Sequence, residues 1–166
     1  LDLHETGHQP MCDSEKRFWI TYNGEIYNYK ELREELKQKG YRFISESDTE
    51  VIIYAYKEWG TNCLGHFNGM WAFVIYDSHT KTLFGARDRF GVKPFYYFAD
   101  KDYFAFASEQ KALVELPFIK KEINPNAVFD FFVLGKMETE PEGFFKNIFE
   151  LFPSTYFLLN TGTGEL

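Results

Sequence analysis

The tripeptide Asn23-Gly24-Glu25 follows a segment rich in aromatic and β-branched residues, 17–22. We expect that segment to be a strand that stops at Asn23-Gly24 and leads into a polar turn. A strand ending in Asn-Gly presents one side-chain amide and one backbone N–H, and glycine permits close approach and a positive φ. Two such donors aimed at one point stabilise charge on a carbonyl oxygen, as an oxyanion hole does in acyl transfer. Alone, Asn-Gly is also an ordinary turn signal.

Asp48 and Asp88 are two further candidates, and each has a structural explanation. Asp48 stands at the start of an expected helix, where it either interacts with the helix dipole and free amides or binds a ligand's ammonium group. Asp88 lies between Arg87 and Arg89, and paired surface charges are the expectation for that run.

Two further patterns could indicate a metal site or a reactive thiol. His4, His8 and Cys12 are spaced four apart, which on a helix would place three ligands on one face. A glycine and a proline interrupt that helix and a fourth ligand is hard to find, so we expect a polar loop and no metal. Cys63 has no neighbouring base or positive field to lower its pKa, so we expect a packing residue.

Two amphipathic helices are expected to follow the first strand. Apolar residues recur at helical spacing between Asn28, a possible cap, and Gly40. A second apolar stripe starts at the capping-box pattern Ser-Asp-Thr-Glu (47–50) and ends before Gly60.

The remainder of the chain predicts two β-hairpins. Their strands are expected at 70–76 with 82–86 and at 95–98 with 103–107, followed by helices at 108–116 and 124–134 and a last strand at 156–159. Sequential hairpins with helices grouped around them indicate an α+β architecture with antiparallel sheets, because parallel sheets need a helix between most strands.

Composition limits the class of protein. The 166 residues fit one domain, 1–166, and the aromatic content of 20% suggests aromatic-rich sheets. A net charge of −7 without a basic stripe argues against nucleic acid, and no apolar stretch is long enough to span a membrane. Two cysteines are too few for a disulfide framework, so a reducing, cytoplasmic location is expected.

Four segments carry a family resemblance. They are Tyr-Asn-Gly-Glu-Ile-Tyr-Asn-Tyr (22–29), Ser-Asp-Thr-Glu-Val (47–51), Phe-Asn-Gly-Met-Trp-Ala-Phe (67–73) and Ala-Arg-Asp-Arg-Phe-Gly-Val-Lys-Pro (86–94). In this order they resemble the glutaminase domain of glutamine-hydrolysing asparagine synthetases, a class II glutamine amidotransferase. The first and last residues fit as well, so the likeness covers essentially the whole chain.

The resemblance implies an N-terminal-nucleophile hydrolase fold, a four-layer sandwich of two antiparallel sheets between helical layers, here incomplete at the N-terminus. It implies that a terminal cysteine attacks the side-chain amide of glutamine, with its own α-amino group as base, and that a thioester is then hydrolysed. On this sequence, the Asn23 side chain and the Gly24 N–H would form the oxyanion hole. Asn23, Glu25 and Asp48 would bind glutamine.

This sequence departs from the family at its start. Neither Cys12 nor Cys63 matches the terminal nucleophile, and the arginine that grips the substrate carboxylate falls before Leu1. We therefore expect a truncated domain that hydrolyses little glutamine by itself, whereas its parent is active. No cofactor is expected here, since ATP and magnesium would act in a synthetase domain beyond the last residues. Missing strands would expose a sheet edge and could favour a homodimer.

Two alternatives remain open. The chain could be a non-catalytic amidotransferase-like module that binds a partner or free glutamine. It could also belong to a class II amidotransferase with a different ammonia acceptor, because this half recognises glutamine and cannot name the acceptor.

Overall fold

The computed structural model describes residues 7–135 and 142–164. Its strands are β1 (Met11–Cys12), β2 (Phe18–Ile26), β3 (Gly69–Asp77), β4 (Thr82–Arg87), β5 (Tyr96–Ala99), β6 (Phe104–Ala107), β7 (Phe149–Glu150) and β8 (Tyr156–Asn160). Its helices are α1 (Tyr29–Gln38), α2 (Asp48–Trp59), the 3-10 helix η2 (Gly60–Gly65), α3 (Gln110–Leu113), α4 (Pro125–Phe129) and the π-helical turn η3 (Asp130–Leu134).

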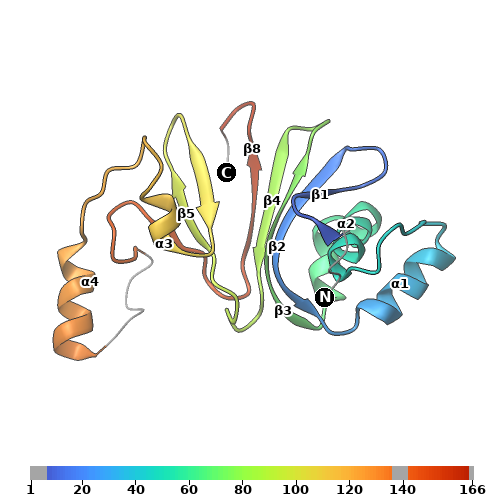
Figure 1. Cartoon of the computed structure of the whole chain (residues 1–166), viewed down its shortest axis with the longest axis horizontal. Helices are drawn as coiled ribbons and strands as arrows, with labels where there is room; N and C mark the ends of the chain where they lie inside the picture. Colours follow the sequence, from blue (N-terminus) through green and yellow to red (C-terminus); the bar gives the residue numbers. More distant parts are fainter. Residues whose placement is uncertain (1–6, 136–141, 165–166) are drawn as a thin grey trace.

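The strands form two antiparallel sheets that face each other. The larger sheet has the order β1-β2-β3-β4-β8 and the smaller one β6-β5-β7. Helices α1 and α2 cover the outer face of the larger sheet, and α3 lies beyond the smaller sheet (Figure 1). This arrangement confirms the predicted α+β sandwich of two antiparallel sheets between helical layers.

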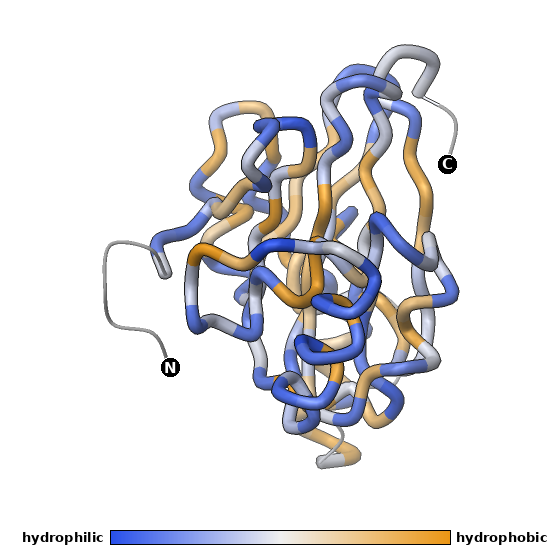
Figure 2. Tube along the Cα trace, turned by 90° about the vertical axis from the view of Figure 1, so that its right-hand side faces the viewer, coloured by the Kyte–Doolittle hydropathy of each residue, from blue (hydrophilic) through white to orange (hydrophobic). Residues whose placement is uncertain are grey.

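Strand alternation explains the layers, because successive side chains point to opposite faces. On β3, Trp71, Phe73 and Ile75 are buried in the core that α2 shares with the larger sheet. The intervening Ala72 and Val74 belong to a second core, between the sheets. Hydrophobic segments accordingly run along the strands at the centre of the molecule (Figure 2).

The predicted helices and hairpins are confirmed in position. Ser47 caps α2 by accepting the Thr49 N–H at 3.2 Å, and Asn124 caps α4 by accepting the Asn126 N–H at 3.1 Å. The helix predicted at 108–116 is shorter, α3 being only four residues long. The short strands β1 and β7 were not predicted, since two-residue strands carry no periodic signal.

The prediction that the first strand stops at Asn23-Gly24 is wrong. Strand β2 continues to Ile26, and Asn23 and Gly24 pair with Ala72 and Trp71 of β3. The partner strand determines the length of β2, because pairing runs without a break down to Ile26 opposite Gly69. The Asn-Gly pair therefore lies inside a strand and not in a turn.

Within the described ranges, no helix is long and apolar enough to cross a bilayer.

Candidate active site

The outer edge of β2 carries a row of backbone N–H groups. Strand β1 covers that edge only at Trp19 and Ile20. Farther along, the Tyr22 N–H donates to Gln9 Oε1 at 2.6 Å and the Ile26 N–H donates to Asp48 Oδ2 at 2.9 Å. Alternate residues of a strand point their N–H groups to the same side, so the Gly24 N–H lies at this edge between the two.

Within the described part of the chain, the Gly24 N–H is an available donor. Among residues 7–135 and 142–164, no acceptor is paired with it. Glycine is required here by close packing: a Cβ would stand 2.3 Å from the Met70 carbonyl oxygen and 2.8 Å from the Trp71 Cα, both backbone atoms. Any side chain at this position would separate β2 from β3, and the donor would move with it.

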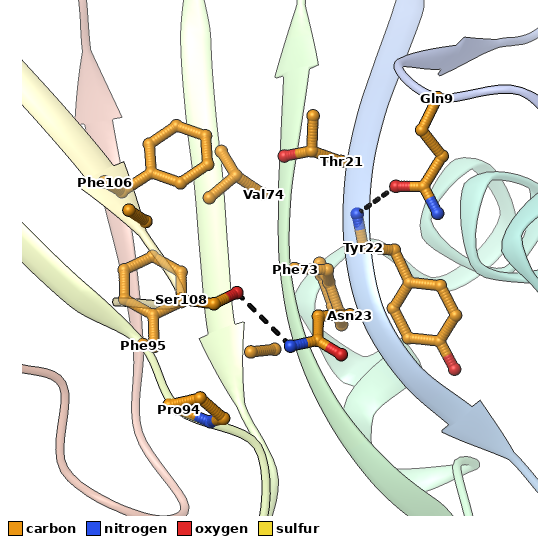
Figure 3. A pocket seen from close by; sticks show the side chains of 12 residues that line it. Gln9, Thr21, Tyr22, Asn23, Phe73, Val74, Pro94, Phe95, Phe106 and Ser108 are labelled. Atoms are coloured by element: carbon orange, nitrogen blue, oxygen red, sulfur yellow. Dashed lines mark hydrogen bonds between the residues drawn. The ribbon is translucent and has the colours of Figure 1, made fainter. Parts of the chain in front are cut away.

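The Asn23 side chain lies on the inner face of β2, toward the smaller sheet. Its Nδ2 donates to Ser108 Oγ at 3.2 Å, across the space between the sheets (Figure 3). That space is a cavity of about 420 Å³. Its lining consists of Gln9, Thr21, Tyr22, Asn23, Ala72, Phe73, Val74, Pro94, Phe95, Phe106, Ala107 and Ser108. Most of these side chains are apolar, so Asn23 and Ser108 are polar groups in a largely apolar cavity.

Two carboxylates gather near the end of β2. Asp48 begins α2, and its Oδ2 accepts the Tyr22 hydroxyl at 2.8 Å as well as the Ile26 N–H. Burial raises the pKa of Tyr22, and the neighbouring carboxylates of Asp48 and Glu25 raise it further. Tyr22 therefore remains a neutral donor at physiological pH. The Glu25 side chain is exposed and lies on the same face of β2 as Asn23.

Arg33 of α1 holds the loop before Asp48 in place. Arg33 is buried, and its guanidinium donates to the carbonyl oxygens of Ser45 at 2.8 Å and Ser47 at 3.0 Å, and to the Glu46 carboxylate at 2.8 Å. The two carbonyls are thereby satisfied in the interior, and the start of α2 is fixed against α1.

The same loop is held from α2 by Glu50. Its carboxylate accepts the Ile44 N–H at 3.0 Å, and the Ser45 N–H and hydroxyl, each at 2.7 Å. The capping-box prediction is therefore only half confirmed: Ser47 caps the helix, but Glu50 binds the preceding loop and the Ser47 N–H donates to Ser45 Oγ at 3.2 Å. Together with Arg33, Glu50 determines where the Asp48 carboxylate sits.

The expectation of surface charges at Asp88 is wrong. Asp88 is 0% exposed, and its carboxylate accepts four backbone N–H groups. Oδ1 accepts those of Phe90 and Val92, both at 3.0 Å, and Oδ2 accepts those of Lys93 at 3.0 Å and Trp71 at 3.3 Å. Burial alone would raise the pKa of Asp88, but these hydrogen bonds favour the ionised form and lower it overall.

Arg87 completes this loop and is also buried. Its guanidinium donates to the carbonyl oxygens of Lys93 at 2.7 Å, Gly91 at 2.8 Å and Leu151 at 2.6 Å, and pairs with Glu150 at 2.6 Å. Because Glu150 lies in β7, the loop joins the larger sheet to the smaller one. Residues that line the cavity follow it directly, at 94 and 95.

Neither cysteine is placed to react at this site. Cys63 is fully buried in the core beneath α2, and burial raises the pKa of its thiol to about 12, which confirms the packing role. Cys12 lies in β1 opposite Trp19. Of the candidate metal ligands, His4 lies outside the described residues. No group of three or more His, Cys, Asp or Glu side chains in the described part of the chain could hold a metal ion.

The sequence patterns did not identify two residues of the site. Gln9 and Ser108 contact β2 from segments far away in the chain, one before β1 and the other after β6. Neither belongs to a local pattern that indicates a binding role, so only the packing of the two sheets could have identified them.

Comparison with known proteins assigns the family. Residues 1–165 match the glutamine amidotransferase domain family. "Asparagine synthetase [glutamine-hydrolyzing] 3" of Bacillus subtilis is 43% identical over 152 residues, covering 90% of this chain and 25% of that protein. A putative asparagine synthetase of Methanocaldococcus jannaschii is 42% identical over 167 residues, covering 91% of this chain and 32% of that protein. The chain thus spans a quarter to a third of the length of these relatives.

Solved structures support the same fold. Glutamine phosphoribosylpyrophosphate amidotransferase from B. subtilis superposes with a TM-score of 0.63 at 21% identity, covering 95% of this chain and 31% of that chain. At this identity the likeness concerns the fold alone. Family match, sequence relatives and architecture agree, and the chain belongs to the glutamine amidotransferase domain family.

Proposed function

We propose that the full-length protein hydrolyses the side-chain amide of glutamine, and that the Asn23 side chain and the Gly24 N–H of this domain form the oxyanion hole. The observation that carries the proposal is the Gly24 N–H at the edge of β2. The equivalent groups of Tyr22 and Ile26 both have acceptors, whereas that of Gly24 has none among the described residues. The Asn23 amide belongs to the preceding residue, so both donors would serve one developing negative charge.

Glu25 and Asp48 would bind the α-ammonium group of glutamine. Glu25 directly precedes Ile26, whose N–H donates to Asp48 Oδ2 at 2.9 Å, so both carboxylates lie at the end of β2. Asp48 uses Oδ2 for Tyr22 and Ile26. Its Oδ1 has no hydrogen-bond partner among the described residues, which leaves this oxygen for a ligand's ammonium.

The attacking thiol would come from the family's terminal cysteine and not from this chain. Cys63 is buried with a raised pKa, and Cys12 lies in β1 and does not line the cavity. We therefore expect residues 1–166 alone to show no appreciable glutamine hydrolysis, because loss of the nucleophile costs several orders of magnitude in rate.

The whole protein would be a glutamine-dependent asparagine synthetase. The sequence relatives named above support this proposal, as they are asparagine synthetases of which this domain is one part. ATP and magnesium would act in the synthetase part, which would use the ammonia to convert aspartate to asparagine. That part is the partner we propose for this domain.

The test is to express the full-length gene product and measure glutamate and asparagine together. We expect glutamate release from glutamine, and asparagine formation that depends on aspartate, ATP and magnesium. Glutamate release without asparagine would leave the glutaminase proposal standing and assign a different ammonia acceptor. Failure to release glutamate under any condition would refute the enzyme proposal in favour of a non-catalytic binding module.

A further inference from the structure

Ser108 is the one described residue that reaches the Asn23 side chain across the cavity. It comes directly after β6 and is held from both sides. Before it, Ala107 pairs with Tyr96 of β5. After it, α3 is anchored by Leu113, which packs with Phe98 in the core behind the smaller sheet. Ser108 is therefore fixed within the smaller sheet, and the Arg87–Glu150 ion pair and the core between the sheets hold that sheet against the larger one.

The Asn23 amide needs such a partner because its terminal torsion is soft. The χ2 angle of asparagine has a broad distribution, so an unrestrained amide rotates and blurs the direction of its donors. An amide nitrogen carries two N–H groups. With one of them on Ser108 Oγ at 3.2 Å, the plane of the amide is fixed and the other N–H stays free. Figure 3 shows the amide nitrogen turned toward Ser108 and the amide oxygen turned away from it.

We infer that Ser108 is a positioning residue for the oxyanion hole, acting from the smaller sheet on Asn23 of the larger one. This inference rests on the proposed glutaminase function and adds a residue to it. Ser108 does not contact the developing charge; it orients the amide that does. Since correct orientation matters most when the charge develops, its loss should affect the catalytic step more than the binding of glutamine.

The experiment measures glutamine hydrolysis by the full-length gene product for Ser108→Ala, Ser108→Thr, Asn23→Ala and the double variant Asn23→Ala/Ser108→Ala. Ser78→Ala is the matched control, because Ser78 is partly buried like Ser108 but lies in the turn after β3, at the far end of the strand from the site. For each protein, kcat, KM for glutamine and the melting temperature are determined.

We expect Ser108→Ala to lower kcat about tenfold, part of the roughly 100-fold or greater loss for a missing oxyanion donor. KM should stay within about twofold, and the melting temperature should match that of Ser78→Ala. Ser108→Thr keeps the hydroxyl and should recover most of kcat. The double variant should be no slower than Asn23→Ala, because the two residues act through one amide.

The outcomes separate the two claims. If Asn23→Ala slows hydrolysis but Ser108→Ala does not, or if both Ser108 variants are equally slow, the positioning role is refuted and the proposed function stands. If Asn23→Ala leaves kcat unchanged, the oxyanion hole itself is misassigned and Ser108 has nothing to position. A double variant much slower than Asn23→Ala would also contradict the inference, since Ser108 would then act by another route.

Discussion

Replacing Asp88 with asparagine tests whether one buried carboxylate organises the loop between the two sheets. Both oxygens of Asp88 are used, each by two backbone N–H groups. Asparagine has the same shape but only one acceptor oxygen. In either orientation, its NH2 group would face two backbone N–H donors, and the negative charge that strengthens all four bonds would be lost.

The expected destabilisation follows from the number of bonds broken. Hydrogen bonds to a charged group contribute about 1.5–3 kcal/mol each, so loss of two predicts a cost of about 3–6 kcal/mol. That is a large part of the total stability of a typical domain, about 5–15 kcal/mol. Trp71 donates to Asp88 and lies opposite Gly24, so the loss should also disturb the candidate oxyanion hole.

Urea unfolding of Asp88→Asn and of Asp100→Asn provides the measurement with a matched control. In Asp100 a single oxygen, Oδ1, accepts the N–H groups of Asp102 at 2.8 Å and Tyr103 at 2.6 Å, in an exposed turn. An asparagine oxygen can keep both bonds, so Asp100→Asn should cost less than about 1 kcal/mol. Similar changes in the unfolding free energy for the two substitutions would refute the role of Asp88 in organising the loop.

Three further substitutions test the binding of glutamine, the packing at Gly24 and the ion pair of Asp77. Tyr22→Phe removes the hydroxyl that holds Asp48 at 2.8 Å, so KM for glutamine should rise several-fold with little change in kcat; a fall in kcat alone would contradict the role of Asp48 in binding. Gly24→Ala places a Cβ 2.3 Å from a backbone oxygen of β3 and should lower glutamine hydrolysis about 100-fold or more; near-normal kinetics would rule out the packing argument. The ion pair between Arg17 and Asp77, at 2.7 Å, lowers the pKa of Asp77. The stability that this ion pair gives the folded state is therefore fully present above the unfolded pKa of about 3.9, and it is lost as the pH falls through the lower folded pKa. In urea unfolding, the stability gap between wild type and Asp77→Asn should be constant near neutral pH and shrink below about pH 4; a gap that grows in acid would show the wrong sign.

Elements with a clear local period could be predicted from the sequence. Helices α1 and α2, both hairpins and β8 carry their own apolar spacing and end signals, and all appear where expected. Where a partner strand decides the outcome, local reading failed. Asn23-Gly24 looks like a turn in the sequence, but pairing with β3 extends the strand past it to Ile26.

The same limit applies to the site. Asn23, Gly24, Glu25 and Asp48 were identified by resemblance, and the structure brings them to one end of β2. Their roles remain predictions. The burial of Asp88 could not be read from Arg-Asp-Arg, because its partners are backbone groups that converge only when the loop folds.

We propose that Asn23 and Gly24 stabilise an oxyanion during glutamine hydrolysis. The most direct test compares Asn23→Ala with wild type in the full-length protein, using first glutamine and then free ammonia as the nitrogen source. We expect the kcat for glutamine hydrolysis to fall about 100-fold or more, with ammonia-dependent asparagine formation unchanged. Unchanged hydrolysis of glutamine by a folded Asn23→Ala variant would contradict it.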